Sequence, residues 1–156
     1  MPQLVKGGKF VYGLSRINPD GIIVIPPVAM DEYGCREGDR VIGISGSRKS
    51  GGLGLTKKSL LEKSALNVFI RELPGLLNFT IPEGEIIASK GRLFCWTLVR
   101  SGGCVCIPLP ALSGYGLEAG NLLVVARGSY LSIAFVARGP IFKEALRHPE
   151  LEIFGE

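Results

Sequence analysis

The stretch GIIVIPPVAMDEYGCREGDRVIGISGS, residues 21–47, aligns without a gap with GCVCIPLPALSGYGLEAGNLLVVARGS, residues 103–129. The two stretches are 82 residues apart and share their Gly and Pro residues in the same order and spacing. Because Gly and Pro set turns and helix ends, this match predicts the same local structure twice. The chain is therefore predicted to contain an internal repeat.

The similarity extends on both sides of these stretches. Upstream, Phe10, Leu14 and Arg16 match residues 94, 98 and 100 at a shift of 84, with the two-residue difference placed in the turn where RINPDG becomes RSGG. Downstream, TKKSLLEKSAL parallels ARGPIFKEALR after a one-residue deletion. The repeats are predicted to span residues 6–66 and 90–148, joined by a linker at 67–89.

Each repeat has the pattern of a β-hairpin, a short helix and a second hairpin. KFVYGLSR and GIIVIP are rich in β-formers around a turn, and Pro26 and Pro108 are placed to end a strand and open a helix. The segments KKSLLEKSAL and IFKEALRHP carry apolar residues at helical spacing. One such unit is too small to bury its apolar faces alone. We expect a mainly β fold with short helices, in which both copies form one pseudo-twofold barrel domain; pairing between two chains as a homodimer is the alternative.

Two motifs resemble a known family: G-x-I-x-I-P at 21–26 and Y-G-x-x-x-G-D-x-V at 33–41. They are similar to the swapped-hairpin motif of AbrB/MazE/SpoVT proteins, and the second copy retains the Pro and Gly positions. The resemblance implies an AbrB-like swapped-hairpin, double-psi-like β-barrel. It also implies DNA binding, as in transcription regulators and antitoxins. The chain departs from the family at Ile22 and Cys104, where a basic residue is common, and at Asn121, which replaces the usual Asp.

Positive charge is concentrated on the two repeats. Residues 6–66 carry ten Lys and Arg against six Asp and Glu, and residues 90–148 carry seven against two, whereas the linker has one against three. Such a bias is typical of a surface that faces phosphates. The predicted DNA contacts lie in the turns and hairpins: Arg16, Arg40, Arg48, Lys49, Arg100 and Arg127. The alternative is that these residues are solvated and protect sheet edges from pairing.

Other motifs indicate little chemistry. SGSRKSGGLG lacks the spacing of a phosphate-binding P-loop and is interpreted as a flexible hairpin tip whose basic pair can touch a phosphate. Cys95, Cys104 and Cys106 are interpreted as small core residues, with a soft-metal site as the alternative. His148 is the only histidine and is expected at an exposed helix end. No catalytic residue, metal or cofactor is expected.

These observations favour a cytoplasmic, non-enzymatic DNA-binding regulator of AbrB type that contacts duplex DNA through a basic barrel face. The alternative is a barrel that binds a protein partner, as an antitoxin or a structural protein does. A small-ligand or enzymatic barrel ranks third. No stretch approaches the apolar length that a membrane-spanning helix needs, and the N-terminus lacks the apolar core of an export signal.

Overall fold

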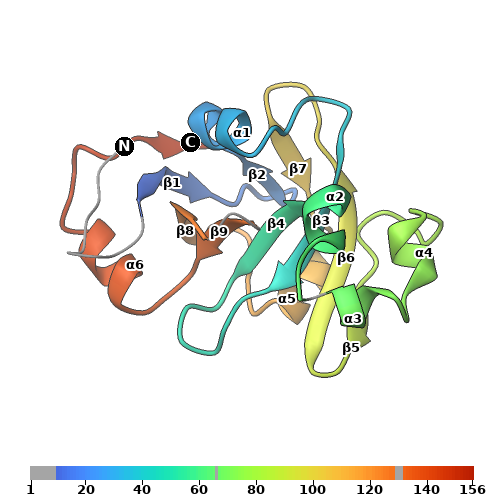
Figure 1. The fold of residues 1–156 in the computed structure, drawn as a ribbon. Helices are drawn as coiled ribbons and strands as arrows, with labels where there is room; N and C mark the ends of the chain where they lie inside the picture. Colours follow the sequence, from blue (N-terminus) through green and yellow to red (C-terminus); the bar gives the residue numbers. More distant parts are fainter. Residues whose placement is uncertain (1–9, 66, 129–131) are drawn as a thin grey trace.

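The computed structural model describes residues 10–65, 67–128 and 132–156, which form a mainly β fold with six short helices among the described residues (Figure 1). In chain order the elements are β1 (Val11–Arg16), β2 (Ile22–Val24), α1 (Pro27–Glu32), β3 (Arg40–Ser45), β4 (Leu53–Lys57), α2 (Lys58–Glu62), α3 (Asn67–Ile70), α4 (Pro74–Leu77), β5 (Ile87–Ser89), β6 (Arg92–Leu98), β7 (Cys104–Cys106), α5 (Leu109–Gly114), β8 (Leu122–Arg127), β9 (Ile133–Val136), α6 (Pro140–Ala145) and β10 (Ile153–Phe154). Within the described ranges, no helix has the length and apolar character needed to cross a membrane.

The predicted repeat is present in the order of the elements. The first copy contains β1, β2, α1, β3, β4 and α2, and the second contains β6, β7, α5, β8, β9 and α6. Helices α1 and α5 both begin directly after Pro26 and Pro108, as predicted, because Pro suits the first turn of a helix. Helices α2 and α6 each bury one residue, Leu61 and Ala145, against the sheet.

The two copies exchange strands. The first strand of each copy pairs antiparallel with the third strand of the other, β1 with β8 and β6 with β3. The ladders β2–β7 and β4–β9 then join equivalent strands across the pair. Their registers are symmetric about Ile23 opposite Val105 and about Gly54 opposite Ala134. A pseudo-twofold axis therefore relates the two copies, and neither copy is a separate domain.

The strand registers correct the upstream alignment. Ser15 lies opposite Leu123, and Thr97 lies opposite Val41. Since Leu123 and Val41 are equivalent at a shift of 82, Ser15 is equivalent to Thr97, and the first turns have equal length. The predicted shift of 84 is wrong here, and Arg16 is equivalent to Leu98 rather than to Arg100. A two-residue slip keeps the inward and outward alternation of a strand, so apolar residues match in either register.

The expected closed barrel is not formed by the described strands. One mixed sheet has the order β10-β1-β8-β9-β4-β3-β6-β5, and β2 and β7 form a separate two-stranded sheet. Two strands outside the predicted repeats extend the sheet: β10 adds parallel to the outer edge of β1, and β5 adds antiparallel to the outer edge of β6. The eight-stranded sheet therefore has two edges, at β10 and β5.

Three apolar clusters hold the layers together. The largest lies between the sheet, the β2–β7 ladder and helices α1 and α5, with Ile23, Val105 and Phe135 buried in it. A second cluster seats α6 on β1 and β8. In the third, Ile70 and Leu76 of the segment predicted as a linker pack on Phe94 and the outer face of β3 and β6. Residues 67–89 thus form part of the folded body, at the opposite end from α6 in Figure 1.

Candidate anion-binding surface

Three of the six arginine and lysine residues predicted to contact DNA are held by glutamates. Arg16 Nε lies 2.8 Å from Glu156 Oε1, Arg100 Nη2 lies 2.8 Å from Glu83 Oε1, and Arg127 Nη2 lies 2.9 Å from Glu32 Oε1. Each pair joins segments that are far apart in the sequence. Each carboxylate neutralises the charge of its arginine, so these three residues attract a phosphate less strongly than an unpaired cation does.

The Arg127 pair is extended by aromatic side chains. Arg127 donates from Nε and Nη2 to both oxygens of Glu32, and its guanidinium lies 4.8 Å from the centre of the Phe10 ring. The Tyr12 hydroxyl donates to Glu32 Oε2 at 2.6 Å. The hydrogen bonds from Arg127 and Tyr12 lower the pKa of Glu32. Burial and the bond to Glu32 raise the pKa of Tyr12. This constellation ties α1 to the strands β1 and β8.

The Arg100 pair anchors the segment before β5. Glu83 accepts hydrogen bonds from Arg100 through both oxygens and also from the Thr97 hydroxyl and the Leu98 amide. The Arg100 guanidinium is the main cause that lowers the pKa of Glu83 from 4.5 to about 2, with the Leu98 amide and Thr97 adding to it. Arg100 therefore serves the attachment of residues 67–89 to the sheet.

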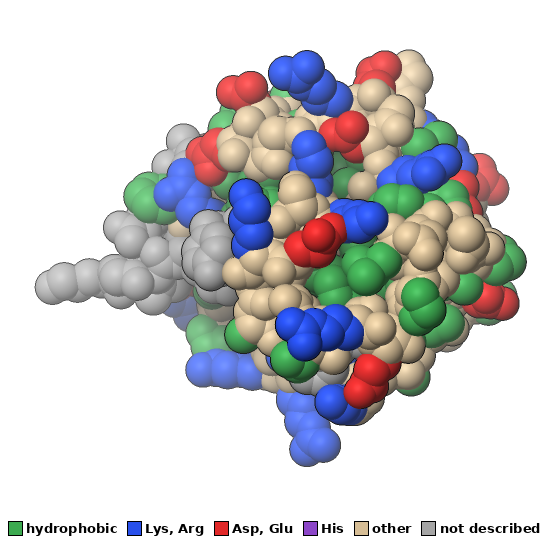
Figure 2. Space-filling view, turned by 45° about the vertical axis from the view of Figure 1, so that its right-hand side comes forward, with side chains coloured by type: hydrophobic (Ala, Val, Ile, Leu, Met, Phe, Trp, Pro, Cys, Tyr) green, Lys and Arg blue, Asp and Glu red, His purple; other side chains and the backbone are tan. Residues whose placement is uncertain are grey.

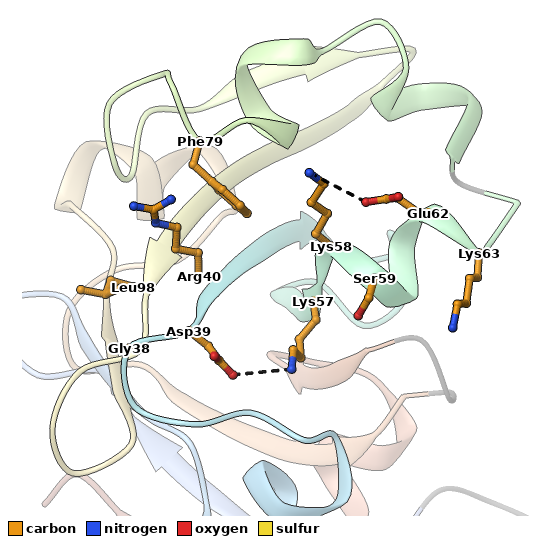
Figure 3. A pocket seen from close by; sticks show the side chains of 10 residues that line it. All are labelled: Gly38, Asp39, Arg40, Lys57, Lys58, Ser59, Glu62, Lys63, Phe79 and Leu98. Carbon is orange, nitrogen blue, oxygen red and sulfur yellow. Dashed lines mark ion pairs between the residues drawn. The ribbon is translucent and has the colours of Figure 1, made fainter.

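Arg40 lies in a different setting, at the rim of a groove of about 680 Å³ (Figure 3). The groove runs between the start of β3, helix α2 and the segment after α4. The Arg40 guanidinium lies 5.3 Å from the centre of the Phe79 ring and 5.6 Å from that of Trp96. Trp96 is itself fixed, because its Nε1 donates to the Ile81 carbonyl at 2.8 Å. The aromatic rings orient Arg40 without neutralising its charge.

The groove carries four cations and two acids. Lys57 Nζ lies 3.6 Å from Asp39 Oδ2 and donates to the Gly34 carbonyl, and Lys58 Nζ lies 4.0 Å from Glu62 Oε1. Within the described part of the chain, Arg40 and Lys63 have no acidic partner. Figure 3 shows them at opposite ends of the groove, with the two ion pairs between them. The two unpaired cations give the groove a net positive charge of two.

Arg48 and Lys49 lie on the loop between β3 and β4 and are exposed. They too have no acidic partner among the described residues. Strand β3 separates this loop from Arg40, and its length places them roughly 17 Å apart. Arg40 and this loop therefore lie at opposite ends of β3. Figure 2 shows acidic side chains mixed among the Lys and Arg of one face.

The cysteines do not form a cluster. Cys95 is buried and lies 3.2 Å from the Tyr115 hydroxyl, which donates to the Gly43 carbonyl. Cys104 and Cys106 lie on the half-exposed face of β7, whereas Val105 between them is fully buried. Among the residues that the structure describes, no group of three His, Cys, Asp or Glu side chains is arranged to hold a metal ion. Burial raises the pKa of the Cys95 thiol.

Most residues of the groove were not expected to bind a ligand. Lys57, Lys58 and Lys63 were assigned to a packing helix, and Phe79 to a linker. The adjacent pair Lys57-Lys58 and the aromatic residue within the linker were the available signals. The glutamates that pair with Arg16, Arg100 and Arg127 could not be identified from the sequence. The partners in these three ion pairs are 140, 17 and 95 residues apart in the chain.

No known protein-family model matches the chain, and neither the curated proteins nor the solved structures contain a match.

Proposed function

We propose that the protein is a DNA-binding regulator of AbrB type, in which one chain supplies both halves of the swapped-hairpin unit. The strand exchange supports the fold part of this proposal, because β1 pairs with β8 and β6 with β3. In the family that the sequence resembles, that exchange usually joins two chains. Here the two copies of the repeat, spaced 82 residues apart, provide both partners within one chain.

The observation that best supports DNA binding is that Arg40 is oriented by its neighbours but not neutralised. Its guanidinium is oriented by two aromatic rings, is exposed and has no carboxylate partner among the described residues. A planar guanidinium held in this way presents its N–H groups to a phosphate at little cost in side-chain entropy. Arg40 therefore contacts a backbone phosphate in the proposed complex.

The groove fits a polyanion better than a single anion. Arg40 and Lys63 lie at its two ends. Between them, Lys57 forms an ion pair with Asp39, and Lys58 forms one with Glu62. A nucleic acid offers phosphates at regular intervals and can engage both ends at once. Phosphate contacts of this kind supply most of the sequence-independent affinity for DNA. Arg16, Arg100 and Arg127 are assigned to structural ion pairs instead.

A fluorescence anisotropy titration with a labelled duplex tests the proposal across 50 to 200 mM salt. Replacing Arg40 and Lys63 by Ala is expected to weaken binding and to reduce the slope of log K against log salt by roughly one unit per cation. The matched control replaces Lys143 and Arg147 by Ala, which removes the same charge from exposed positions at α6 and just beyond it. The control is expected to keep the wild-type slope.

Two outcomes contradict the proposal. Equal loss in both double variants means that the net charge of the chain, and not the groove, attracts DNA. Absence of duplex binding at low salt removes the function altogether. In that case, capture of an acidic protein by the wild type but not by R40A/K63A favours the protein-binding alternative, which the apolar walls Phe79 and Leu98 also suit.

A further inference from the structure

The loop between β3 and β4 is held in place by the rest of the fold. The Ser50 carbonyl accepts hydrogen bonds from the amides of Ala137 and Arg138 at 2.9 and 3.0 Å. Arg138 also donates from Nε and Nη2 to the Arg48 carbonyl at 3.0 and 2.7 Å. The segment predicted as a flexible hairpin tip thus makes both backbone and side-chain hydrogen bonds to the residues after β9. An added Cβ at Gly52 would clash with the Phe135 carbonyl, so the glycine allows close packing.

A hollow of about 260 Å³ lies between this loop and the segment that leads into α6. It is large enough for a phosphate group, since a water molecule occupies only ~30 Å³. Its charged lining consists of Lys49 and Arg138, and no acidic residue contributes to it. In the described chain, neither side chain has an acidic partner. Two neighbouring cations without a counter-charge leave this hollow electropositive.

The donors at the hollow exceed the acceptors. Arg138 uses Nε and Nη2 for the Arg48 carbonyl, and its Nη1 has no hydrogen bond with the described residues. The hydroxyls of Ser47 and Ser50 lie 2.9 Å apart, so only one of the two protons is used between them. Lys49 adds three N–H donors. An oxyanion is the ligand that would satisfy all of these groups together.

We infer that Lys49, Arg138 and the Ser47–Ser50 hydroxyl pair form a second anion site that binds a phosphate group. The site is separate from the groove at Arg40, because strand β3 lies between them. Lys49 supplies charge, Arg138 supplies an oriented N–H edge, and the free hydroxyl proton supplies a third donor. The phosphate can come from a free phosphate or from a nucleic acid backbone, and the two sources are distinguished by experiment.

NMR of the amide-labelled full chain in phosphate-free buffer tests the site, with inorganic phosphate and a short DNA duplex as separate titrants and chloride as the ionic-strength control. Either titrant is expected to shift the amides of Ser50 and Arg138 and the Arg138 Nε–H signal. Shifts with both titrants assign the site to phosphate groups in general, and shifts with the duplex alone assign it to a nucleic acid backbone. The absence of shifts with both overturns the inference.

Variants separate this site from the groove. Lys49→Ala is expected to weaken phosphate binding roughly tenfold, the effect of losing one charge-assisted hydrogen bond. The Lys49 side chain makes no hydrogen bond or ion pair with the described residues, so the fold is expected to persist. Lys143→Ala, an exposed lysine on the neighbouring helix, is the control and should leave binding unchanged. The R40A/K63A variant should also bind phosphate at the loop normally. Equal weakening by Lys49→Ala and Lys143→Ala contradicts the site.

Discussion

The two copies of the repeat have the same order of elements, but different segments pack on the outer edges of their first strands, β1 and β6. The outer edge of β1 pairs in parallel with β10, which brings Glu156 to Arg16. The outer edge of β6 pairs with β5, and the preceding segment brings Glu83 to Arg100. The extra segments thus neutralise Arg16 and Arg100, whereas Arg127 is paired with Glu32 inside the repeats. Arg40, at the rim of the groove, is replaced by Leu122 at the equivalent position of β8.

The largest expected effect concerns the cover on the second copy. Phe94 of β6 is fully buried beneath Ile70 and Leu76, and its equivalent in β1 is the smaller Val11. Phe94→Ala is expected to lower the free energy of unfolding by about 3–5 kcal/mol. Val11→Ala is expected to cost roughly 2 kcal/mol, since it removes two carbon atoms. Urea titrations of both variants measure this difference; equal losses would mean that the 67–89 layer adds little.

The next effect is a difference in pH-dependent stability between the Arg100–Glu83 pair and the Arg16–Glu156 pair. The pKa of Glu83 is lowered from 4.5 to about 2, so folding favours its ionised form. That stability is complete above about pH 5 and is lost as the pH falls toward 2. It corresponds to about 2–3 kcal/mol, since one pKa unit is worth 1.36 kcal/mol and the carboxylate is partly exposed.

Replacement of each glutamate by Gln checks this interpretation. Glu83→Gln is expected to remove most of the loss of stability between pH 5 and pH 2, as measured by urea titrations at several pH values. Glu156→Gln is the comparison, because the Arg16–Glu156 pair is more exposed. It should change Tm by less than about 2 °C at pH 7. A wild-type acid profile retained by the Glu83→Gln variant would contradict the role of the Glu83 pair.

A smaller effect is expected at the edge that β10 covers. An added Cβ at Gly13 would lie 2.9 Å from the Glu152 carbonyl and 3.0 Å from the Phe154 ring. Gly13→Ala is therefore expected to displace β10 and to cost about 1–3 kcal/mol. Hydrogen exchange of the Leu14 amide, which donates to the Glu152 carbonyl, reports the displacement directly. Cys95→Ala at the equivalent position of β6 should leave that amide protected; protection in the Gly13→Ala variant would contradict the tight contact.

The smallest effect is expected at the Arg127–Glu32 pair. Both side chains are partly exposed, Arg127 by 40% and Glu32 by 31%, and ion pairs in contact with solvent contribute little to stability. Arg127→Ala should shift Tm by less than about 2 °C in a thermal melt. It should also leave the salt dependence of duplex binding unchanged, because Glu32 already occupies the guanidinium. A reduced salt slope would show that Arg127 contacts DNA after all.

The repeat could be predicted from the sequence because Gly and Pro mark its turns and helix ends. Pro26 and Pro108 placed α1 and α5 correctly, and the strands of both copies follow their β-rich runs. The register of β1 could not be fixed, since matches two residues apart preserve the alternation of a strand. At the start of β1 a β-bulge adds one residue, so Val11 rather than Phe10 is equivalent to Phe94.

The candidate site was less predictable than the fold. Charge counts indicated which repeats are basic, but they could not show that Arg16, Arg100 and Arg127 are each paired with a glutamate. Nor could the spacing of Phe79 in the linker indicate that its ring would lie beneath Arg40. The Arg127–Glu32 pair forms between the two repeats. The other two pairs and the position of Phe79 depend on how residues 67–89 and the C-terminal segment fold back on the repeats. The repeat motif carries no information about those segments.

The most direct test of the functional account compares unpaired with paired cations in one experiment. Duplex binding is measured by anisotropy across salt for the wild type, R40A/K63A and R16A/R127A, two variants with equal loss of charge. The account predicts a weaker affinity and a salt slope lower by roughly two units for R40A/K63A, with R16A/R127A close to the wild type. Wild-type binding by R40A/K63A, together with a reduced slope for R16A/R127A, would contradict it.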